Sequence, residues 1–375
     1  MSNLPTRLQR VGMSVSLCIL ISGTAAGCAF NKGGTPVATN APATTAFSKA
    51  AVLAAGLASL GHASGPINGT MKVGSETRTL SGTVTLNGKA SQINLVESGQ
   101  SDVTLNEILI ANHRYTSPDG KIWIDRGTKA AGTSLAAVLA AADTKFDAGV
   151  STVDGVKAHQ ILTAPDKVDV APALGIDTWT FDNETTILRV WADDAGKPLG
   201  FGASMSWQVT IGGEKQDVSA DLDVMFTYTS PSDITAPATP WQWIQDNDAG
   251  IAFGLPKSWG KRSSSAKLTL YSLQGTKSDL GYSHVDGGNE SIEQAAQDVA
   301  RGLSGNTSSP ESISLASERA MRLTNDNTKA GMYLVEVIVI HETIGYVVAT
   351  AGSRDDKPAV DTLADQIFST VEFTR

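Results

Sequence analysis

Apolar and polar residues alternate with a period of two along residues 199–228, and this is the clearest pattern in the chain. In its first half, the apolar face carries Leu199, Phe201, Ala203, Met205, Trp207, Val209 and Ile211. After the turn signal Gly212-Gly213, the apolar face carries Val218, Ala220, Leu222, Val224, Phe226 and Tyr228. Successive side chains of a strand point to opposite faces of its sheet, so the pattern predicts an antiparallel hairpin with one apolar and one polar face.

Shorter alternating segments precede this hairpin, and we expect each to form a strand. They cover residues 67–73, 80–86, 93–96, 108–115, 122–124 and 156–162. Apolar residues at helical spacing predict helices over 47–60 and 134–142, both rich in Ala. A helix covers about two strands, so two helices leave much of a sheet of about ten strands uncovered. The sheet therefore either packs its apolar face as a filled core or curls around a ligand, and the pattern leaves both open.

The pattern restarts at Trp241, after a Pro-rich linker at residues 231–240. We expect strands over 251–255, 267–273, 313–315, 320–323, 332–340 and 344–350. A helix is expected over 291–303, where Ser291 begins a capping-box spacing, and another over 358–369, where Pro358 occupies the first turn. An antiparallel sheet backed by two helices follows from this order.

Composition limits the class of protein. The 375 residues suffice for two domains at roughly 100–200 residues each. A net charge of -9 argues against nucleic acid as a partner, because phosphate binding relies on clustered Lys and Arg. With 41% hydrophobic and 18% charged residues, the chain is neither disordered throughout nor a multi-span membrane protein.

The N-terminal segment has the three parts of a secretory signal. Arg7 and Arg10 precede an apolar run over residues 11–21, which is too short to span a bilayer and is followed by small residues. The only two cysteines are Cys18 and Cys28, so the chain beyond them has no disulfide, thiolate metal site or Cys nucleophile.

Ala25-Ala26-Gly27-Cys28 resembles a bacterial lipobox, with Ala25 in place of the usual Leu. The resemblance implies that Cys28 is acylated and becomes the first residue of the mature chain, held at the extracytoplasmic face of the cell membrane. The alternative is an ordinary signal peptide cut near Ala26. Residues 28–45 are rich in Thr, Ala, Pro and Gly and lack periodicity, which predicts a flexible tether. The expected organisation is therefore a signal peptide over 1–27, the tether over 28–45, and domains over 46–235 and 236–375.

Residues 46–235 resemble the LppX/LprG-type mycobacterial lipoproteins, which have the LolA-like fold. The resemblance rests on the order of the elements and on Tyr115, Asp119-Gly120, Trp123, Val153-Asp154-Gly155-Val156, Val190-Trp191 and Gly196-Lys197-Pro198. It implies a half-open antiparallel β-barrel with a helical lid and a hydrophobic cavity for the acyl chains of envelope lipids. The cavity would then be lined by Trp191, Phe201, Met205, Trp207, Leu222, Val224 and Phe226.

Residues 241–375 resemble the PsbP-like fold. The resemblance rests on the segment Gly250-Ile251-Ala252-Phe253-Gly254-Leu255-Pro256, on Trp259, and on the closing helix followed by Val371-Glu372-Phe373. It implies a smaller antiparallel sheet backed by helices, with a protein partner as its expected ligand. The fold class expected for the whole chain is α+β.

The sequence carries no recognisable catalytic or metal-binding motif, so we expect a protein that is not an enzyme and needs no cofactor or metal. The five histidines lack metal-ligand spacing, and the nearest acidic neighbours, Asp286 beside His284 and Glu342 beside His341, are better explained as ordinary polar positions. The acidic strand face Asp217, Ser219, Asp221 and Asp223 lacks the glycine and terminal Glu of a calcium loop, which favours a solvated face. The expected function is binding or shuttling of an envelope lipid or other apolar molecule. The alternative is a scaffold lipoprotein with filled cores.

Overall fold

A computed structural model describes residues 62–87, 90–99, 103–110, 113–128, 146–153, 155–163, 182–211, 214–228, 233–265, 268–276, 278–286, 291–316 and 318–374. The predicted signal peptide, Cys28, the tether and the expected helices over 47–60 and 134–142 lie outside these residues. The described part is mostly β, with two sheets and two α-helices.

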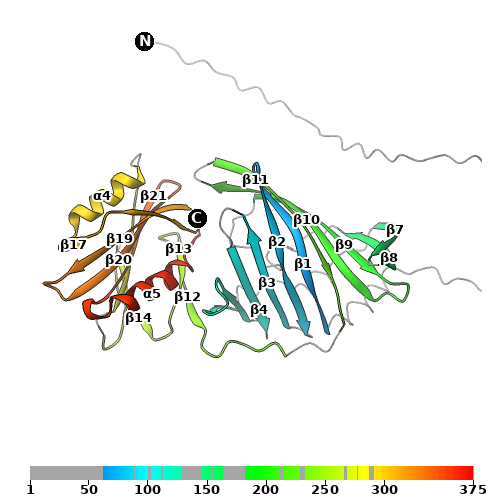
Figure 1. The fold of residues 1–375 in the computed structure, drawn as a ribbon, viewed down its shortest axis with the longest axis horizontal. Helices are drawn as coiled ribbons and strands as arrows, with labels where there is room; N and C mark the ends of the chain where they lie inside the picture. The colour runs from blue at the N-terminus through cyan, green and yellow to red at the C-terminus, as the bar shows by residue number, and fades with distance from the viewer. Residues whose placement is uncertain are drawn as a thin grey trace, which may run out of the picture. The chain divides into compact units, whose positions relative to one another are not determined.

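The first sheet has fourteen strands in the order β22-β13-β12-β6-β5-β4-β3-β2-β1-β11-β10-β9-β8-β7, most of which are seen side by side in Figure 1. The strands that precede residue 235 are β1 (His62–Val73), β2 (Glu76–Asn87), β3 (Ala90–Ser98), β4 (Val103–Ile110), β5 (His113–Ser117), β6 (Ile124–Gly127), β7 (Phe146–Val153), β8 (Val156–Thr163), β9 (Asp182–Ala192), β10 (Pro198–Ile211) and β11 (Glu214–Met225). Three strands from later in the chain extend it: β12 (Trp241–Asp246), β13 (Ile251–Leu255) and β22 (Glu372–Phe373). Its two end strands do not pair with each other, so the described sheet is open.

The predicted hairpin over residues 199–228 is confirmed as β10 and β11. The two strands pair antiparallel, with Met205 opposite Ala220 and Trp207 opposite Val218. Their apolar side chains are buried on one face, as the period of two requires. This face joins the apolar sides of β1, β2, β3, β8 and β9 in a single buried cluster, which we call the first-sheet core.

Glycines on the apolar face bring neighbouring strands unusually close. Gly69 lies between Ile67 and Met71 on β1, and a Cβ there would be 2.3 Å from the carbonyl oxygen of Asp221. A Cβ at Gly82 of β2 would be 2.0 Å from the carbonyl oxygen of Asn94. Glycine inside a strand marks a tight bend or a close backbone approach, so these positions let the sheet bend toward its apolar face.

The second sheet has eight strands, seven of them in the order β14-β15-β16-β21-β20-β19-β17, while β18 pairs with β19. These strands are β14 (Trp259–Ser264), β15 (Leu268–Leu273), β16 (Asp279–Asp286), β17 (Asn306–Thr307), β18 (Glu311–Leu315), β19 (Glu318–Asn327), β20 (Met332–His341) and β21 (Ile344–Ser353). The pairing is antiparallel throughout, as predicted.

Two helices pack on opposite faces of this second sheet. Helix α4 (Ile292–Gly302) packs on Met321, Leu323 and Ile338, and the Ser291 side chain caps it by accepting from the Gln294 N–H. Helix α5 (Lys357–Phe368) follows the short 3-10 turn η1 (Arg354–Asp356) and packs with the other face of β20 and β21 and with β13. Both predicted helices are confirmed.

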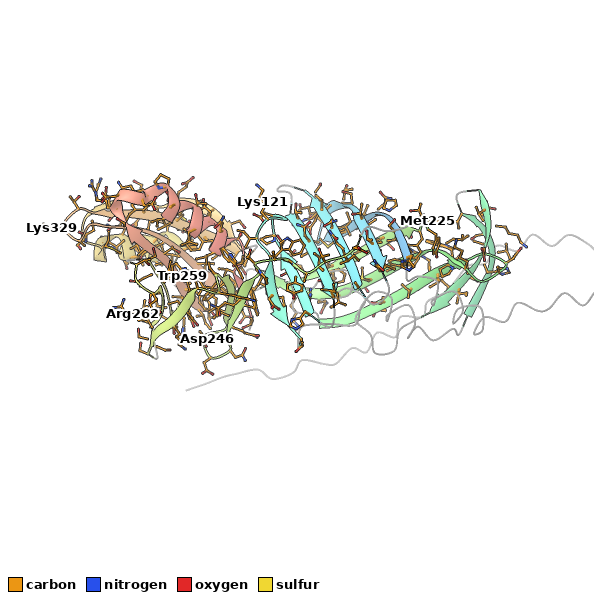
Figure 2. The ribbon with its side chains drawn as sticks, turned by 90° about the horizontal axis from the view of Figure 1, so that it is seen from below. Lys121, Met225, Asp246, Trp259, Arg262 and Lys329 are labelled. Carbon is orange, nitrogen blue, oxygen red and sulfur yellow. The ribbon has the colours of Figure 1, made fainter. Side chains whose placement is uncertain are left out.

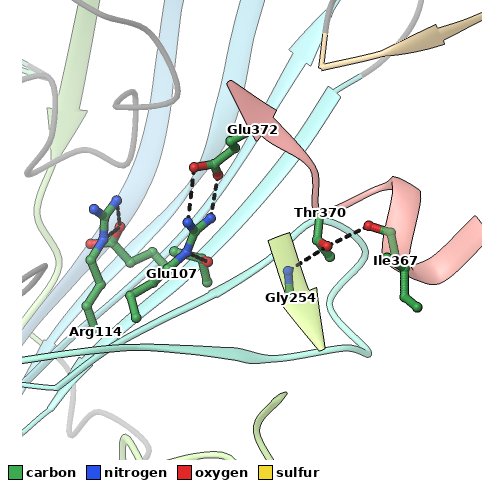
Figure 3. Close-up of polar contacts among 8 residues, drawn as sticks. Glu107, Arg114, Gly254, Ile367, Thr370 and Glu372 are labelled. Carbon is green, nitrogen blue, oxygen red and sulfur yellow. Dashed lines mark hydrogen bonds and ion pairs between the residues drawn. The ribbon is translucent and has the colours of Figure 1, made fainter. Parts of the chain in front are cut away.

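Polar contacts join strands of the first sheet that come from distant parts of the chain (Figure 3). The Arg126 guanidinium donates to both carboxylate oxygens of Glu372, at 2.5 and 3.1 Å, and stacks 3.5 Å from the ring centre of Trp243. Strand β12 pairs with β6 in parallel, whereas the other pairings of the first sheet are antiparallel. The Thr370 hydroxyl accepts from the Gly254 N–H at 2.9 Å and donates to the Ile367 carbonyl at 2.6 Å.

The strand predictions need several corrections. The segment 108–115 is split between β4 and β5, and the strand expected over 122–124 lies instead at Ile124–Gly127. Strands β7, β9, β12, β14, β16, β17 and β22 were not predicted. Strand β14 buries only Trp259 and exposes its other five residues, so it has no alternation to detect. The described part of the chain is mostly β, with two sheets and two helices, and strands from beyond residue 240 join the first sheet.

Candidate functional site

Six of the seven side chains predicted to line a cavity lie together on the apolar face of the first sheet. They are Phe201, Met205, Trp207, Leu222, Val224 and Phe226, with exposed fractions between 0% and 9%. The rings of Phe201 and Phe226 are 5.9 Å apart, and Phe226 in turn contacts Tyr228. The sequence pattern therefore identified one continuous apolar surface correctly.

Trp191 does not join them. On β9, Leu188 and Val190 are buried in the first-sheet core, so the alternation of the strand turns Trp191 to the opposite face, where it is half-buried. Its placement among the lining residues is therefore wrong. Val190, one position earlier, is the β9 residue that faces the other six.

The first-sheet core consists of apolar side chains. On the other face, the acidic residues of β11 have polar partners: Asp217 accepts from Gln208, Asp221 from Ser204, and Asp223 lies 3.5 Å from Arg189. The buried side chains of the core face are suited to contact with hydrocarbon. Its chemistry is that of a packed core or an acyl-chain surface.

A polar cavity of about 640 Å³ lies elsewhere, between the β12–β13 turn and strands β14–β16. It is lined by Gln245, Asp246, Asn247, Asp248, Ala249, Lys261, Ser264, Ser265, Leu268, Thr269, Tyr271, Tyr282 and His284. Asp246 lies at the end of β12, near the turn that forms one wall of the cavity (Figure 2). No sequence motif marks this cavity, because the residues that line it are brought together only by the fold.

A partly buried pair of hydrogen bonds to Asp246 fixes the wall of this polar cavity. The Tyr282 hydroxyl donates to the Asp246 carboxylate at 2.5 Å, and the same carboxylate accepts from the Ala249 N–H at 3.0 Å. Burial, together with the neighbouring carboxylate, raises the pKa of the Tyr282 phenol well above its usual value. Burial alone would raise the pKa of Asp246, but these hydrogen bonds to its charged form outweigh it and hold that pKa low. Tyr282 thus acts as a hydrogen-bond donor and Asp246 as a fixed acceptor, a structural pair rather than an acid and base.

The histidines have other partners than their sequence neighbours. His341 Nδ1 lies 3.0 Å from Glu318, and its ring stacks on Phe373 at 4.5 Å. His284 lines the polar cavity and lies beside the ring of Tyr346. Among the described residues, no group of three or more His, Cys, Asp or Glu is arranged to hold a metal ion. Within the same residues, no helix has the length and apolar character needed to cross a membrane.

Comparisons with known proteins found distant structural similarities. No protein-family model and no curated protein sequence matches the chain. The solution structure of cyanobacterial PsbP (CyanoP) from Synechocystis sp. PCC 6803 is 13% identical over 38% of this chain and 98% of its own, with a TM-score of 0.30. The Mycobacterium tuberculosis lipoprotein LppX is 15% identical over 50% of this chain and 100% of its own, with a TM-score of 0.28. MucB in the Pseudomonas aeruginosa MucA/MucB complex is 10% identical over 87% of this chain and 99% of its own, with a TM-score of 0.25. At these identities and scores the similarities describe strand arrangement only and do not indicate a ligand or a partner.

Proposed function

We propose that this chain is an extracytoplasmic lipoprotein that binds an envelope lipid or another apolar molecule against the first-sheet core. The observation that carries the proposal is the continuous apolar face of β1, β2, β10 and β11, together with glycines that let the sheet bend toward it. Acylation of Cys28 would hold the chain at the membrane, where its ligand is found. The second sheet would contact a protein partner, and we propose no catalytic role for either sheet.

Burial of an acyl chain on this apolar face would supply enough free energy for binding. Each methylene transferred from water to such a face contributes about 0.8 kcal/mol, so ten methylenes contribute about 8 kcal/mol, equivalent to micromolar affinity. Because the buried cluster consists of apolar side chains, it would recognise the hydrocarbon part of a ligand and leave the head group to solvent or to the rim. Broad selectivity among acyl chains is expected.

One observation favours the alternative of a scaffold lipoprotein with a filled core. The six apolar residues are at most 9% exposed, and none of them lines the polar cavity. Side chains with this exposure are found both in packed cores and in closed ligand sites, so the two functions differ in whether a bound molecule is present.

The test uses the mature chain with Cys28→Ser, purified from a cell fraction free of membranes. The purified chain is examined by native mass spectrometry and by organic extraction. We expect an apolar molecule bound in near-stoichiometric amount. In a second experiment, Met205→Trp should displace this molecule while the chain stays folded, whereas Ser206→Trp, on the exposed face, should retain it. A chain that carries no apolar molecule, and that Met205→Trp strongly destabilises, would establish the filled core instead.

Membrane attachment is tested separately. With Cys28 intact, a palmitate analogue should label the chain and the chain should sediment with membranes. Cys28→Ser should abolish both. Unchanged sedimentation of the variant would reject the lipobox and leave the ordinary signal peptide.

A further inference from the structure

Helix α4 covers only part of the outer face of the second sheet. This face carries Leu334, Glu336 and Ile338 from β20 and, opposite them on β21, Ala351, Ala349 and Val347. The helix packs on Ile338 and on the neighbouring residues of β19. Beside the helix, toward β15 and β16, no described element covers the sheet.

A groove of about 300 Å³ lies over this uncovered part. Its floor is made of small residues, Gly281, Ala349 and Ala351, and its walls include larger apolar side chains from β15 and β20, Leu268, Leu270 and Leu334. Leu268 is 45% exposed, although it is a large apolar side chain on a sheet surface. The volume is at the small end of the range for ligand sites, and the wall is mostly hydrocarbon.

A buried carboxylate faces this apolar groove. Glu336 is only 8% exposed and lines the groove, and its Oε2 atom has no hydrogen-bond partner. Burial raises the pKa of Glu336 to about 7. A buried polar group without a partner is costly, and proteins keep such groups chiefly where a ligand or water satisfies them.

The charged residues around the groove favour a positively charged ligand. Besides Glu336, the charged lining residue is Asp279, which lies 3.5 Å from the exposed Arg262 on β14. No Lys, Arg or His is among the residues that line the described groove. An anionic ligand would therefore meet two carboxylates in an apolar setting, whereas a cation would be attracted to both.

We propose that this groove binds a small amphipathic amine, whose ammonium group pairs with Glu336 and whose hydrocarbon part lies on Leu268, Leu270 and Ala349. The ammonium supplies the hydrogen-bond donor that Oε2 lacks, and the pair is charge-assisted. The hydrocarbon part covers apolar surface that is exposed in the free protein. The site is independent of the lipid-binding function proposed above, since it lies on the other sheet.

The test measures binding of hexylammonium to the mature chain at pH 8 by isothermal titration calorimetry, with hexanol and hexanoate as the neutral and anionic analogues. We expect hexylammonium to bind at least about ten-fold more tightly than hexanol, because a hydrogen bond to a charged group contributes more than a neutral one, and hexanoate to bind least. Glu336→Gln should reduce the affinity for hexylammonium to that for hexanol. The matched control Glu311→Gln, on an exposed position of β18, should leave it unchanged.

A second variant tests the shape of the groove independently of its charge. Ala349→Leu adds bulk to the floor and should abolish binding of both hexylammonium and hexanol. The proposal is overturned if hexylammonium does not bind, if hexanoate binds as well as the amine, or if Glu336→Gln or Ala349→Leu binds the amine like the unmodified chain. Circular dichroism of each variant confirms that the sheet is intact.

Discussion

The bend of the first sheet toward its apolar face depends on glycine, and Gly82→Ala tests this dependence. Gly82 lies on β2 between Leu80 and Val84, on the face of the first-sheet core. A Cβ at this position would lie 2.0 Å from the Asn94 carbonyl oxygen and 3.0 Å from the Leu95 Cα. Both obstacles are backbone atoms of the neighbouring strand, so no side-chain rotation can relieve the contact.

The magnitude follows from this geometry. A carbon and an oxygen pack at about 3.5 Å, so β2 and β3 would have to separate by more than 1 Å near Gly82. Forcing an extra methyl group into a packed core costs about 1–3 kcal/mol, which corresponds to a decrease in melting temperature of about 2–12 °C for a unit of this size. The expected gain from restricting the unfolded chain, about 0.4–1 kcal/mol, offsets only part of it.

Gly260→Ala provides the matched control. Gly260 is also a strand residue, on β14, but a Cβ there would meet nothing within 4 Å. Only the unfolded-state effect remains, so the variant should be as stable as the unmodified chain or slightly more stable. Thermal unfolding followed by circular dichroism measures both variants. Equal melting temperatures for Gly82→Ala and Gly260→Ala would refute the claim that the first sheet requires glycine where it bends.

Three further predictions concern Glu336 of the second sheet and the contacts of Thr370 and Arg126 with strands of the first sheet. Burial raises the pKa of Glu336 to about 7 in the folded chain, so between pH 4.5 and 7 the folded chain holds a proton on Glu336 that the unfolded chain has lost. The free energy of unfolding therefore falls as pH rises through this range. Glu336→Gln should therefore unfold at higher urea concentration than the unmodified chain at pH 8, by about 3 kcal/mol, and should lose this advantage at pH 4; an advantage that does not change with pH would contradict the assignment. Thr370→Val removes the acceptor of the buried Gly254 N–H and should lower the free energy of unfolding by about 1–3 kcal/mol in urea titrations, whereas Thr370→Ser should retain most of it. Arg126→Lys loses both the two-point contact with Glu372 and the stacked guanidinium, and we expect it to lower stability by about 1–2 kcal/mol, with no loss refuting the role of that pair.

The sequence was informative wherever one local rule dominated. The period of two in β10 and β11 predicted both the hairpin and its buried face, since a strand with one dry face must alternate. Helices α4 and α5 followed from a cap at Ser291 and from Pro358 in a first turn. Trp191 was misplaced because the buried residues of β9 are Leu188 and Val190. Trp191 follows Val190 directly, so its side chain points to the opposite face.

Long-range contacts left no such signal. The bond between Tyr282 and Asp246 joins residues 36 positions apart, and the polar cavity exists only because the strands bring those residues together. Glu336 was hidden in a different way, as one charged residue inside an otherwise apolar strand. Nothing in the order of residues says whether such a carboxylate meets a partner, a helix or an open groove.

Strand β20 shows why a groove should exist at that place. Its sequence is an almost continuous apolar run, which is typical of a strand covered on both faces, and helix α5 and the second-sheet core do cover the side that carries Val335, Val337 and Val339. The other side depends on α4, an 11-residue helix about 16 Å long and about 10–12 Å wide, which covers about two of the eight strands. Apolar positions beyond its reach stay exposed, and small residues on β16 and β21 deepen the surface there. Glu336 lies at the border between the covered and uncovered parts, where a charge is shielded from water on the helix side yet remains accessible to a ligand from the groove.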